Sequence, residues 1–453
     1  MTLTKPDITT SLTGKWKSYP AYKDSGVEWL GEIPEHWEVK RLKYVAPFST
    51  VKLAEKPDDL SYLGLENIES TTGRLLLDAP IENVESTVGV FEKGNVLFGK
   101  LRPYLAKVAY MDFRGVCTTE LLALQPKDTV NGKFLFYRLL SQNFIKLVNS
   151  LTYGTKMPRA SGEQIGSIAI QLPSLFEQHS IAAFLDRETT KINALIAKKE
   201  RLVELLQEKR AALISQAVTK GLDPTGPVRD SGVGWLGEIP EHWEVKRLKF
   251  VANFWGGGTP SKENLDYWSG DIPWISPKDM KAEIVYDAED HITEYAIEHS
   301  ATRLIQPGAV LIVVRSGILR HSIPVAINAR PVTLNQDMKA LITEPFLRAE
   351  YLASLIRGHA HALLVEWRKE GATVESIEFE LLANTPCPIP PLPEQQAIVT
   401  FIDHEMAKID ALISRIREGV EKLKEYSTAL ISAAVTGKVD VRGEITPLDD
   451  MDL

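Results

Sequence analysis

Two segments of the 453-residue chain have glycine spacings that resemble phosphate-binding loops. Residues 94–100 read GNVLFGK, the GxxxxGK spacing in which backbone N–H groups and a lysine hold nucleotide phosphates. However, Leu101 stands where a Mg²⁺-binding serine or threonine belongs, the Val-Leu-Phe interior is typical of a strand, and Pro103 blocks a following helix. Residues 254–258 resemble a glycine-rich cofactor turn, but a Thr-Pro pair follows instead of a helix. We therefore interpret the first segment as a strand and the second as a surface loop.

Other residue types that carry chemistry also lack the expected spacing. The chain contains no (N/D)PP(Y/F) tetrapeptide for amino-group methylation and no HExxH. His359 and His361 lie two apart, which on a helix would splay them. Cys117 and Cys387 have no CxxC partner, so we expect isolated, reduced thiols. The sequence predicts no catalytic residue, no metal and no cofactor, and it favours recognition.

Composition limits the class of protein. The length predicts about three or four domains or subdomains. The hydrophobic fraction of 44% is typical of a soluble globular protein, no apolar run could span a membrane, and the N-terminus lacks an apolar signal region. We expect a cytoplasmic protein without membrane contact. The net charge of −8 argues mildly against nucleic acid, so local patches or a basic partner would have to supply the attraction to phosphates.

The chain contains an internal repeat with two unlike inserts. Residues 24–46 and 230–252 differ at only two of 23 positions. A looser repeat begins at Glu177 and again at Glu394. The stretches between these repeats do not resemble each other. A duplicated frame with two different inserts indicates a reader of two-part targets.

Tryptophans recur within the duplicated segment. Trp29 and Trp37 flank a proline in the first copy, and Trp235 and Trp243 occupy the same places in the second. A specificity element would not be copied unchanged beside two different inserts. We therefore predict a packing clasp and not a base-stacking platform.

The inserts have the patterns of mixed α/β domains. Strands are predicted at residues 95–98, 121–124 and 309–314, and helices at residues 133–150 and 348–365.

Two long helices are predicted at residues 177–219 and 394–436, each about 65 Å long. Their narrow apolar seams need a second long helix beside them, so the chain should form an intramolecular coiled coil. The Lys220–Gly226 segment should end the first helix and link the two halves.

These patterns give seven expected regions. They are a loosely ordered lead-in with the first conserved repeat (1–46), a first variable domain (47–172), the first conserved helix with its linker (173–223), the second copy of the repeat (224–252), a second variable domain (253–391), the second conserved helix (392–440) and a C-terminal tail (441–453).

Four separated motifs of the sequence, in the right order, resemble the specificity subunit of bacterial type I restriction–modification systems. They are the duplicated YKDSGVEWLGEIPEHWEVKRLK segment and the helix starts LPSLFEQHSIAAFLD and LPEQQAIVTFID. The resemblance covers the chain from about Tyr19 to Asp440. It implies two variable α/β target-recognition domains, separated by two long helices that pack as an antiparallel coiled coil with an internal pseudo-two-fold. It also implies that each domain reads half of a bipartite target in double-stranded DNA. Catalysis would belong to partners, namely two methyltransferase (modification) subunits and restriction/translocase subunits.

Base-edge readout requires polar side chains on loops or strand ends. The candidates in the first insert are Lys100, Arg102 and Tyr104, and the loop residues Tyr153, Lys156 and Arg159, whose loop resembles one near the DNA face in this family. In the second insert they are Lys278, Arg315, Arg320, Asn335 and Gln336. Each could instead be a solvated surface group. The charge balance is +1 for residues 47–171 but −6 for residues 253–389, which puts phosphate contacts of the second insert in doubt.

Two other functional hypotheses stay open at this point. One is a coiled-coil scaffold whose inserts bind proteins and not DNA. The other is an enzyme that uses ATP or S-adenosylmethionine at the two glycine-containing segments.

Overall fold

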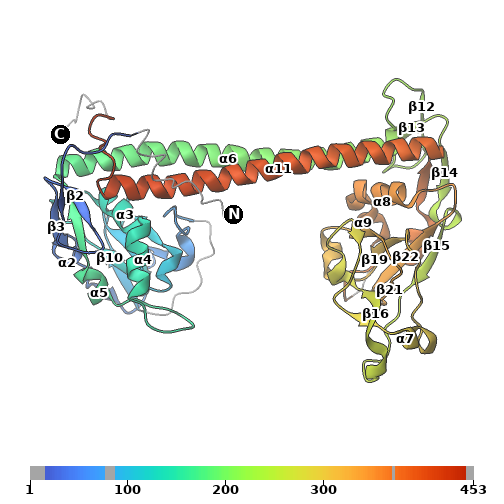
Figure 1. The fold of residues 1–453 in the computed structure, drawn as a ribbon, viewed down its shortest axis with the longest axis horizontal. Helices are drawn as coiled ribbons and strands as arrows, with labels where there is room; N and C mark the ends of the chain where they lie inside the picture. The colour runs from blue at the N-terminus through green and yellow to red at the C-terminus, as the bar shows by residue number, and fades with distance from the viewer. Residues whose placement is uncertain (1–15, 77–86, 370–372, 445–453) are drawn as a thin grey trace, which may run out of the picture. The chain divides into compact units, whose positions relative to one another are not determined.

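The computed structural model describes residues 16–76, 87–369 and 373–444 and divides the chain into two compact units (Figure 1). Unit 1 comprises residues 1–200 and 417–453, and unit 2 comprises residues 201–416. Among the described residues, no helix combines the length and the apolar character needed to cross a bilayer.

The two larger sheets of unit 1 are formed by strands of the first insert. The first has the strand order β4-β6-β9-β5, with β4 at Lys52–Leu53, β6 at Val88–Phe91, β9 at Gly115–Thr118 and β5 at Ser61–Leu63. The second has the order β10-β7-β8, with β10 at Leu121–Leu124, β7 at Val96–Gly99 and β8 at Val108–Tyr110. All four residues of β7 are buried, which confirms that the phosphate-loop-like segment contains a strand.

The predicted helix at 133–150 is two helices, α3 (Gly132–Leu140) and α4 (Gln142–Ser150). Ser141 between them has extended backbone (φ −60°, ψ 139°). Its hydroxyl donates to the carbonyl of Arg138 (2.7 Å) and accepts from the buried guanidinium of Arg138 (2.9 Å). The apolar periodicity continues across this break, so the single-helix prediction was wrong. A short helix, α5 (Gly162–Ser167), follows.

Unit 2 has a five-stranded sheet in the order β15-β22-β19-β20-β17, formed by Ala252–Gly256, Met338–Thr343, Val310–Val313, Val325–Asn328 and Ile284–Val285. A three-stranded sheet pairs β18 (His291–Ile292) and β21 (Thr333–Leu334) with β16 (Trp268–Ile275). The surface-loop prediction for residues 254–258 was wrong, because β15 extends to Gly256. A Cβ on Gly257 would lie 1.9 Å from the carbonyl oxygen of Asn335, so close packing explains this glycine.

The second predicted insert helix, at 348–365, is also broken. Helix α8 (Ala349–Gly358) ends before His359, and α9 (Ala360–Trp367) follows it. His359 Nδ1 donates to the carbonyl of Leu355 (3.1 Å), and Nε2 lies 3.0 Å from the Ser215 hydroxyl. His359 and His361 therefore do not share one helix. Among the described residues, the other α-helices of this insert are α7 (Glu294–His299) and α10 (Phe379–Asn384).

The two repeat copies fold alike. Hairpin β1–β2 (Tyr22–Asp24, Glu32–Pro34) matches β12–β13 (Val228–Asp230, Glu238–Pro240). Strand β3 (Glu38–Arg41) pairs with β11 (Ala169–Leu172), as β14 (Glu244–Arg247) pairs with β23 (Pro386–Ile389). Short turns of helix, α2 (Leu42–Val45) and η3 (Leu248–Phe250), follow β3 and β14.

The tryptophan clasp is confirmed. The buried indoles of Trp37 and Trp243 donate to the carboxylates of Glu177 (3.1 Å) and Glu394 (2.8 Å). Before the first copy, however, Trp16 and Tyr19 are buried, so the part of the lead-in that the structure describes is packed and not loosely ordered.

The predicted long helices are present as α6 (Leu175–Lys220) and α11 (Leu392–Val435). In unit 1 the beginning of α6 shares a core with the end of α11, through Ile181, Leu185, Leu430 and Ala434. In unit 2 the end of α6 shares a core with the beginning of α11, through Ile214, Val218, Ile398 and Ile402. Within each unit the pair is therefore antiparallel, as the resemblance implies. Gly221 follows α6 with a φ of +70°, the conformation for which a glycine is favoured at a helix end.

Candidate nucleic-acid interface

In unit 1 the chain leaves β7 through Lys100–Tyr104 and meets the hairpin loop Tyr153–Arg159. The Arg102 N–H donates to the carbonyl of Pro158 (2.7 Å), and the Ala160 N–H donates to the carbonyl of Lys100 (2.9 Å). Tyr153 and Arg159 close the loop through two backbone bonds of 3.0 Å each. The structure thus brings together all six residues predicted for the first insert: Lys100, Arg102, Tyr104, Tyr153, Lys156 and Arg159.

The two aromatic rings of this cluster face outward on a constrained backbone. Tyr104 and Tyr153 are 51% and 60% exposed, although both carry large rings. Arg102 has a φ of +50°, a left-handed conformation that is strained for a residue before a proline. Its backbone bond to Pro158 holds it in that conformation. Strain of this kind, about 1–3 kcal/mol, is concentrated at binding and catalytic sites.

Glu120 is an acidic residue that belongs to this cluster. Its carbonyl accepts the Lys100 N–H (3.0 Å), and its carboxylate pairs with the Arg159 guanidinium (3.0 Å). Of the four predicted cations, Arg159 is the one with an ion pair among the residues that the structure describes. The cluster therefore has excess positive charge available for phosphates or guanine edges.

Unit 2 repeats the same backbone arrangement after β19. The Ser316 N–H donates to the carbonyl of Glu375 (3.0 Å), and the Ile377 N–H donates to the carbonyl of Val314 (2.8 Å). The Val314 N–H donates to the carbonyl of Asp337 (2.8 Å), as that of Lys100 does to Glu120. We call this arrangement the strand-exit junction. It consists of residues 100–102, 120 and 158–160 in unit 1, and of residues 314–316, 337 and 375–377 in unit 2.

Four of the five residues predicted for unit 2 gather at its strand-exit junction. Arg315 forms an ion pair with Asp337 (2.6 Å). The backbone N–H of Asp337 donates to the side-chain oxygen of Asn335 (3.0 Å), and the carboxylate of Asp337 accepts from the side-chain amide of Gln336 (3.4 Å). Gln336 also accepts from the Thr259 hydroxyl. Arg320 lies 3.5 Å from the carboxylate of Glu375. Asn335 is only 6% exposed, so it positions Asp337 more readily than it reaches a ligand.

Lys278 is not joined to this set. It follows β16, and its ammonium is held by the carboxylates of Asp290 (2.9 Å) and Glu289 (3.1 Å). These bonds raise the pKa of Lys278, with the bond to Asp290 as the largest cause. A lysine with two carboxylate partners attracts phosphate weakly.

The sequence reasoning missed one loop of unit 2 and the acidic residues of both junctions, Glu120, Asp337 and Glu375. The Lys369 N–H donates to the carbonyl of Ser376 (2.9 Å), as that of Tyr153 does to Arg159, so Arg368 and Lys369 begin the counterpart of the Tyr153 loop. Residues 370–372 of that loop lie outside the described residues. The two loops share no sequence pattern. Position along the chain was the available signal, because each loop lies between the second helix of a broken pair (α4 or α9) and the short helix (α5 or α10) that precedes the Pro-rich stop.

With this geometry established, comparison with known proteins identifies the class. The family model described as "Type I restriction modification DNA specificity domain" matches residues 34–205 and again residues 240–422. These two matches cover well over half of the chain. The chain belongs to this family of type I restriction–modification DNA specificity proteins.

Several curated relatives are specificity subunits. The chain is 42% identical over 180 residues to that of the Escherichia coli type I restriction enzyme EcoR124I/EcoR124II, a match that covers 40% of this chain and 44% of the relative. It is 32% identical over 198 residues to that of MjaIX from Methanocaldococcus jannaschii, covering 43% of this chain and 44% of the relative. The matches thus span less than half of these two relatives. For MjaVIII of the same archaeon the identity is 23% over 442 residues, covering 90% of this chain and 94% of the relative.

Two solved structures share the fold. A chain from a type I restriction–modification system, studied for complex assembly and conformational transition, is 20% identical with a TM-score of 0.63, covering 89% of this chain and 98% of its own. The HsdS subunit from Thermoanaerobacter tengcongensis is 18% identical with a TM-score of 0.51, covering 90% of this chain and 98% of its own.

Proposed function

We propose that this chain is the non-catalytic DNA sequence-specificity subunit of a type I restriction–modification complex. It reads a two-part target in double-stranded DNA, one half with each unit. The observation that carries the proposal is the strand-exit junction, which has the same backbone bonds in both units but different polar side chains. The same backbone arrangement with different polar side chains suits the recognition of two different half-sites. The alternative of a protein-binding coiled-coil scaffold does not account for membership in this family.

The target-recognition domains in this proposal are residues 47–172 and 253–391. In the first, Arg102 and Arg159 are the groups for guanine edges, because a guanidinium can donate two hydrogen bonds to one guanine. Tyr104 and Tyr153 pack beside the backbone or bases. In the second, Arg315 and Gln336 are the reading groups, with Arg320 and Lys369 near the phosphates.

Partners complete the complex. Two methyltransferase subunits bind the duplicated repeats, supply S-adenosylmethionine chemistry and hold much of the phosphate backbone, which offsets the acidic balance of unit 2. Restriction/translocase subunits join them, and the complex acts in the cytoplasm. Helices α6 and α11 are continuous over 46 and 44 residues, which suits a spacer that fixes the distance between the half-sites.

A DNA-binding assay tests this function against the scaffold alternative. The chain would be mixed with its methyltransferase subunit and with random double-stranded DNA, and binding would be measured between 50 and 200 mM salt. We expect the affinity to fall steeply with salt, by roughly 10³-fold or more for six or more phosphate contacts. Binding that is absent, or that does not depend on salt, would favour the scaffold.

A further inference from the structure

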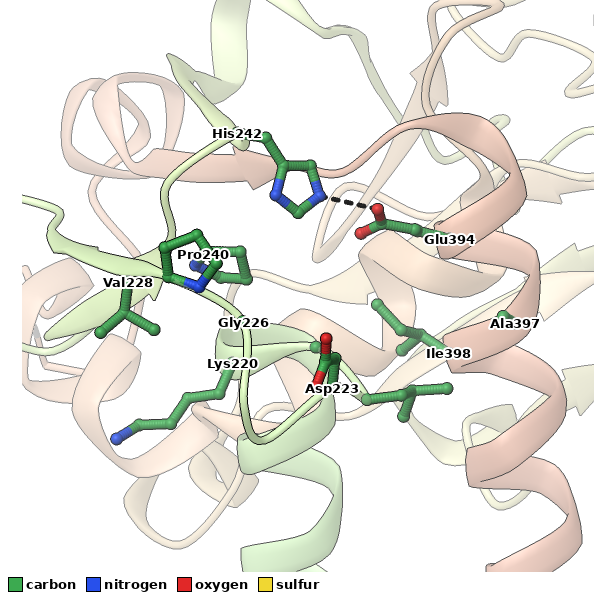
Figure 2. Close-up of a pocket in the computed structure, with 12 residues that line it drawn as sticks. Lys220, Asp223, Gly226, Val228, Pro240, His242, Glu394, Ala397 and Ile398 are labelled. Carbon is green, nitrogen blue, oxygen red and sulfur yellow. Dashed lines mark hydrogen bonds and ion pairs between the residues drawn. The ribbon is translucent and has the colours of Figure 1, made fainter.

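Unit 2 contains a pocket of about 310 Å³ where the end of α6 and its linker meet the start of α11 (Figure 2). Pro240, Ala397 and Ile398 supply apolar walls, and the carboxylate of Glu394 lies at the pocket (Figure 2). That carboxylate accepts from His242 Nε2 (2.7 Å) and from Trp243 Nε1 (2.8 Å). The Glu394 side chain is still 42% exposed, so part of it faces the open space. We call this pocket the Glu394 socket.

Unit 1 has the same arrangement around Glu177, but there the space is filled. The Glu177 carboxylate accepts from His36 (2.9 Å) and Trp37 (3.1 Å), and also from the hydroxyl of Tyr19 (2.7 Å). The Glu177 side chain is only 3% exposed. The guanidinium of Arg442 lies 4.9 Å from the centroid of the Tyr19 ring and covers it. The first copy thus shows that a tyrosine completes this arrangement of histidine, tryptophan and glutamate.

The second copy lacks the residues that do this. The repeat offset places Thr225 where Tyr19 stands, and Thr225 is exposed, with its hydroxyl donating to Asp223 (2.7 Å) and not to Glu394. Leu222 takes the place of Trp16 and is 43% exposed, whereas Trp16 is 8% exposed. Tyr19, which closes the site in unit 1, and Trp16, which packs on Phe184 of the same helix, are therefore replaced in unit 2 by smaller, exposed side chains.

We propose that the Glu394 socket is the docking site for a tyrosine presented by a peptide segment of a partner protein. The apolar walls accept the ring, and the carboxylate accepts the phenol O–H, as Glu177 does from Tyr19. Buried aromatic side chains with one polar tip are the usual anchors of protein interfaces. A nucleic acid is the wrong occupant, because the carboxylates of Glu394 and Asp223 repel phosphates, and the cationic groups of the lining already face carboxylates, Lys220 with Glu238 (3.8 Å) and His242 with Glu394 (2.7 Å).

The difference between the units also sets the stoichiometry. The Glu177 site is closed by the chain's own Tyr19, and Tyr19 is 4% exposed. A partner that needs such a site can therefore bind the chain once and not twice. This distinguishes the partner from a pair of subunits that bind both repeat copies in the same way.

Direct titration of the full chain tests the proposal. The probe is a fluorescently labelled peptide that copies residues 16–22 of this chain, WKSYPAY, because this segment fits the equivalent site in unit 1. We expect saturable binding of one peptide per chain, measured by fluorescence anisotropy. A peptide with Tyr19→Phe should bind about 10-fold or more weakly, since it loses a hydrogen bond to a charged group.

Variants of the chain complete the design. Glu394→Gln should weaken the tyrosine peptide about 10-fold. Glu421→Gln is the matched control, because Glu421 is exposed on the same helix and pairs only with Lys424 (3.0 Å) among the described residues, and it should leave binding unchanged. If Glu394→Gln fails to fold, as judged by circular dichroism, the two peptides on the unaltered chain still decide the question.

Three results would overturn the proposal. They are no saturable binding up to millimolar peptide, equal affinity for the tyrosine and phenylalanine peptides, and two peptides bound per chain. N-acetyl-tyrosinamide is the further probe. If it binds as tightly as the peptide, the socket takes a small phenol and not a protein segment.

Discussion

Each strand-exit junction contains at least one backbone-linked acidic residue that pairs with an arginine. Glu120 pairs with Arg159 in unit 1, and Asp337 pairs with Arg315 in unit 2. The Arg315 side chain is 53% exposed, and exposed ion pairs of this kind contribute only about 0–1 kcal/mol. The carboxylate can therefore hold the guanidinium in place and release it to a base edge at small cost. This suits recognition groups that must be oriented before DNA arrives.

Arg102 provides the residue-scale test of the unit 1 junction. Arg102→Gln should weaken binding to the cognate target by about 1–3 kcal/mol, since a bidentate contact to a base is lost. It should also lower the sequence specificity for one half-site. The measurement is a gel shift with a target set that varies each half separately. Arg114→Ala is the control, because Arg114 is exposed and pairs with Glu92 (3.1 Å) away from the junction. A loss of sequence specificity for the other half-site would show that Arg102 has been assigned to the wrong half-site.

His359 makes the stability of unit 2 depend on pH. Burial lowers the pKa of His359 from its usual 6.5, so the native state binds the proton less readily than the unfolded chain does. Its contribution to stability is therefore present above about pH 6.5 and is lost as the pH falls from there toward the lowered folded pKa. We expect the urea midpoint to fall between pH 7 and pH 5, and to fall less in His359→Gln.

The control for this measurement is His361→Gln, an exposed histidine on α9. It should keep the full pH dependence of the unaltered chain. An equal loss of stability in His359→Gln and in the unaltered chain would mean that other groups cause the dependence.

At the scale of elements, the sequence predicted the long helices well and the insert helices less well. Helices α6 and α11 begin two residues earlier than predicted and end within one residue, because apolar spacing, proline stops and a terminal glycine all agree. The insert helices were each predicted as one segment. At the breaks, Ser141 and His359 form hydrogen bonds with Arg138 and Ser215, and such partners cannot be read from periodicity.

The helix pair makes a testable prediction about spacing. A Cβ on Gly419 would lie 3.5 Å from Nζ of Lys199, so these two positions are opposite each other. We consider a variant with seven residues inserted after Lys198 in α6 and seven after Gly419 in α11. These insertions preserve the apolar seam and lengthen each helix by about 10 Å. We expect a target whose spacer is longer by about three base pairs, at about 3.4 Å each, with both half-sites unchanged.

Mapping of modified adenines in DNA provides the measurement for the inserted variant. An insertion in α6 alone is the control, and it should lower the thermal stability because the two seams no longer match. Unchanged spacer length in the double insertion would exclude the helices as the spacer.

At the scale of the whole molecule, the near-identical repeat was enough to predict a duplicated frame with two different surfaces. The eleven candidate residues were chosen from loops and strand ends. The structure gathers ten of them at the two junctions and leaves Lys278 aside. The sequence could not predict that the two junctions are equivalent, because backbone hydrogen bonds make them alike while their side chains are unrelated. The Arg102 N–H donates to Pro158 in unit 1, for example, and the Ser316 N–H donates to Glu375 in unit 2.

The most direct test of the account is a map of modified adenines after residues 47–172 are replaced by the corresponding domain of another family member. The chimaera would be expressed with its methyltransferase subunit, beside the unaltered chain. We predict that one half of the target changes while the other half and the spacer stay the same. A change in both halves, or in neither, would contradict the assignment of one half-site to each unit.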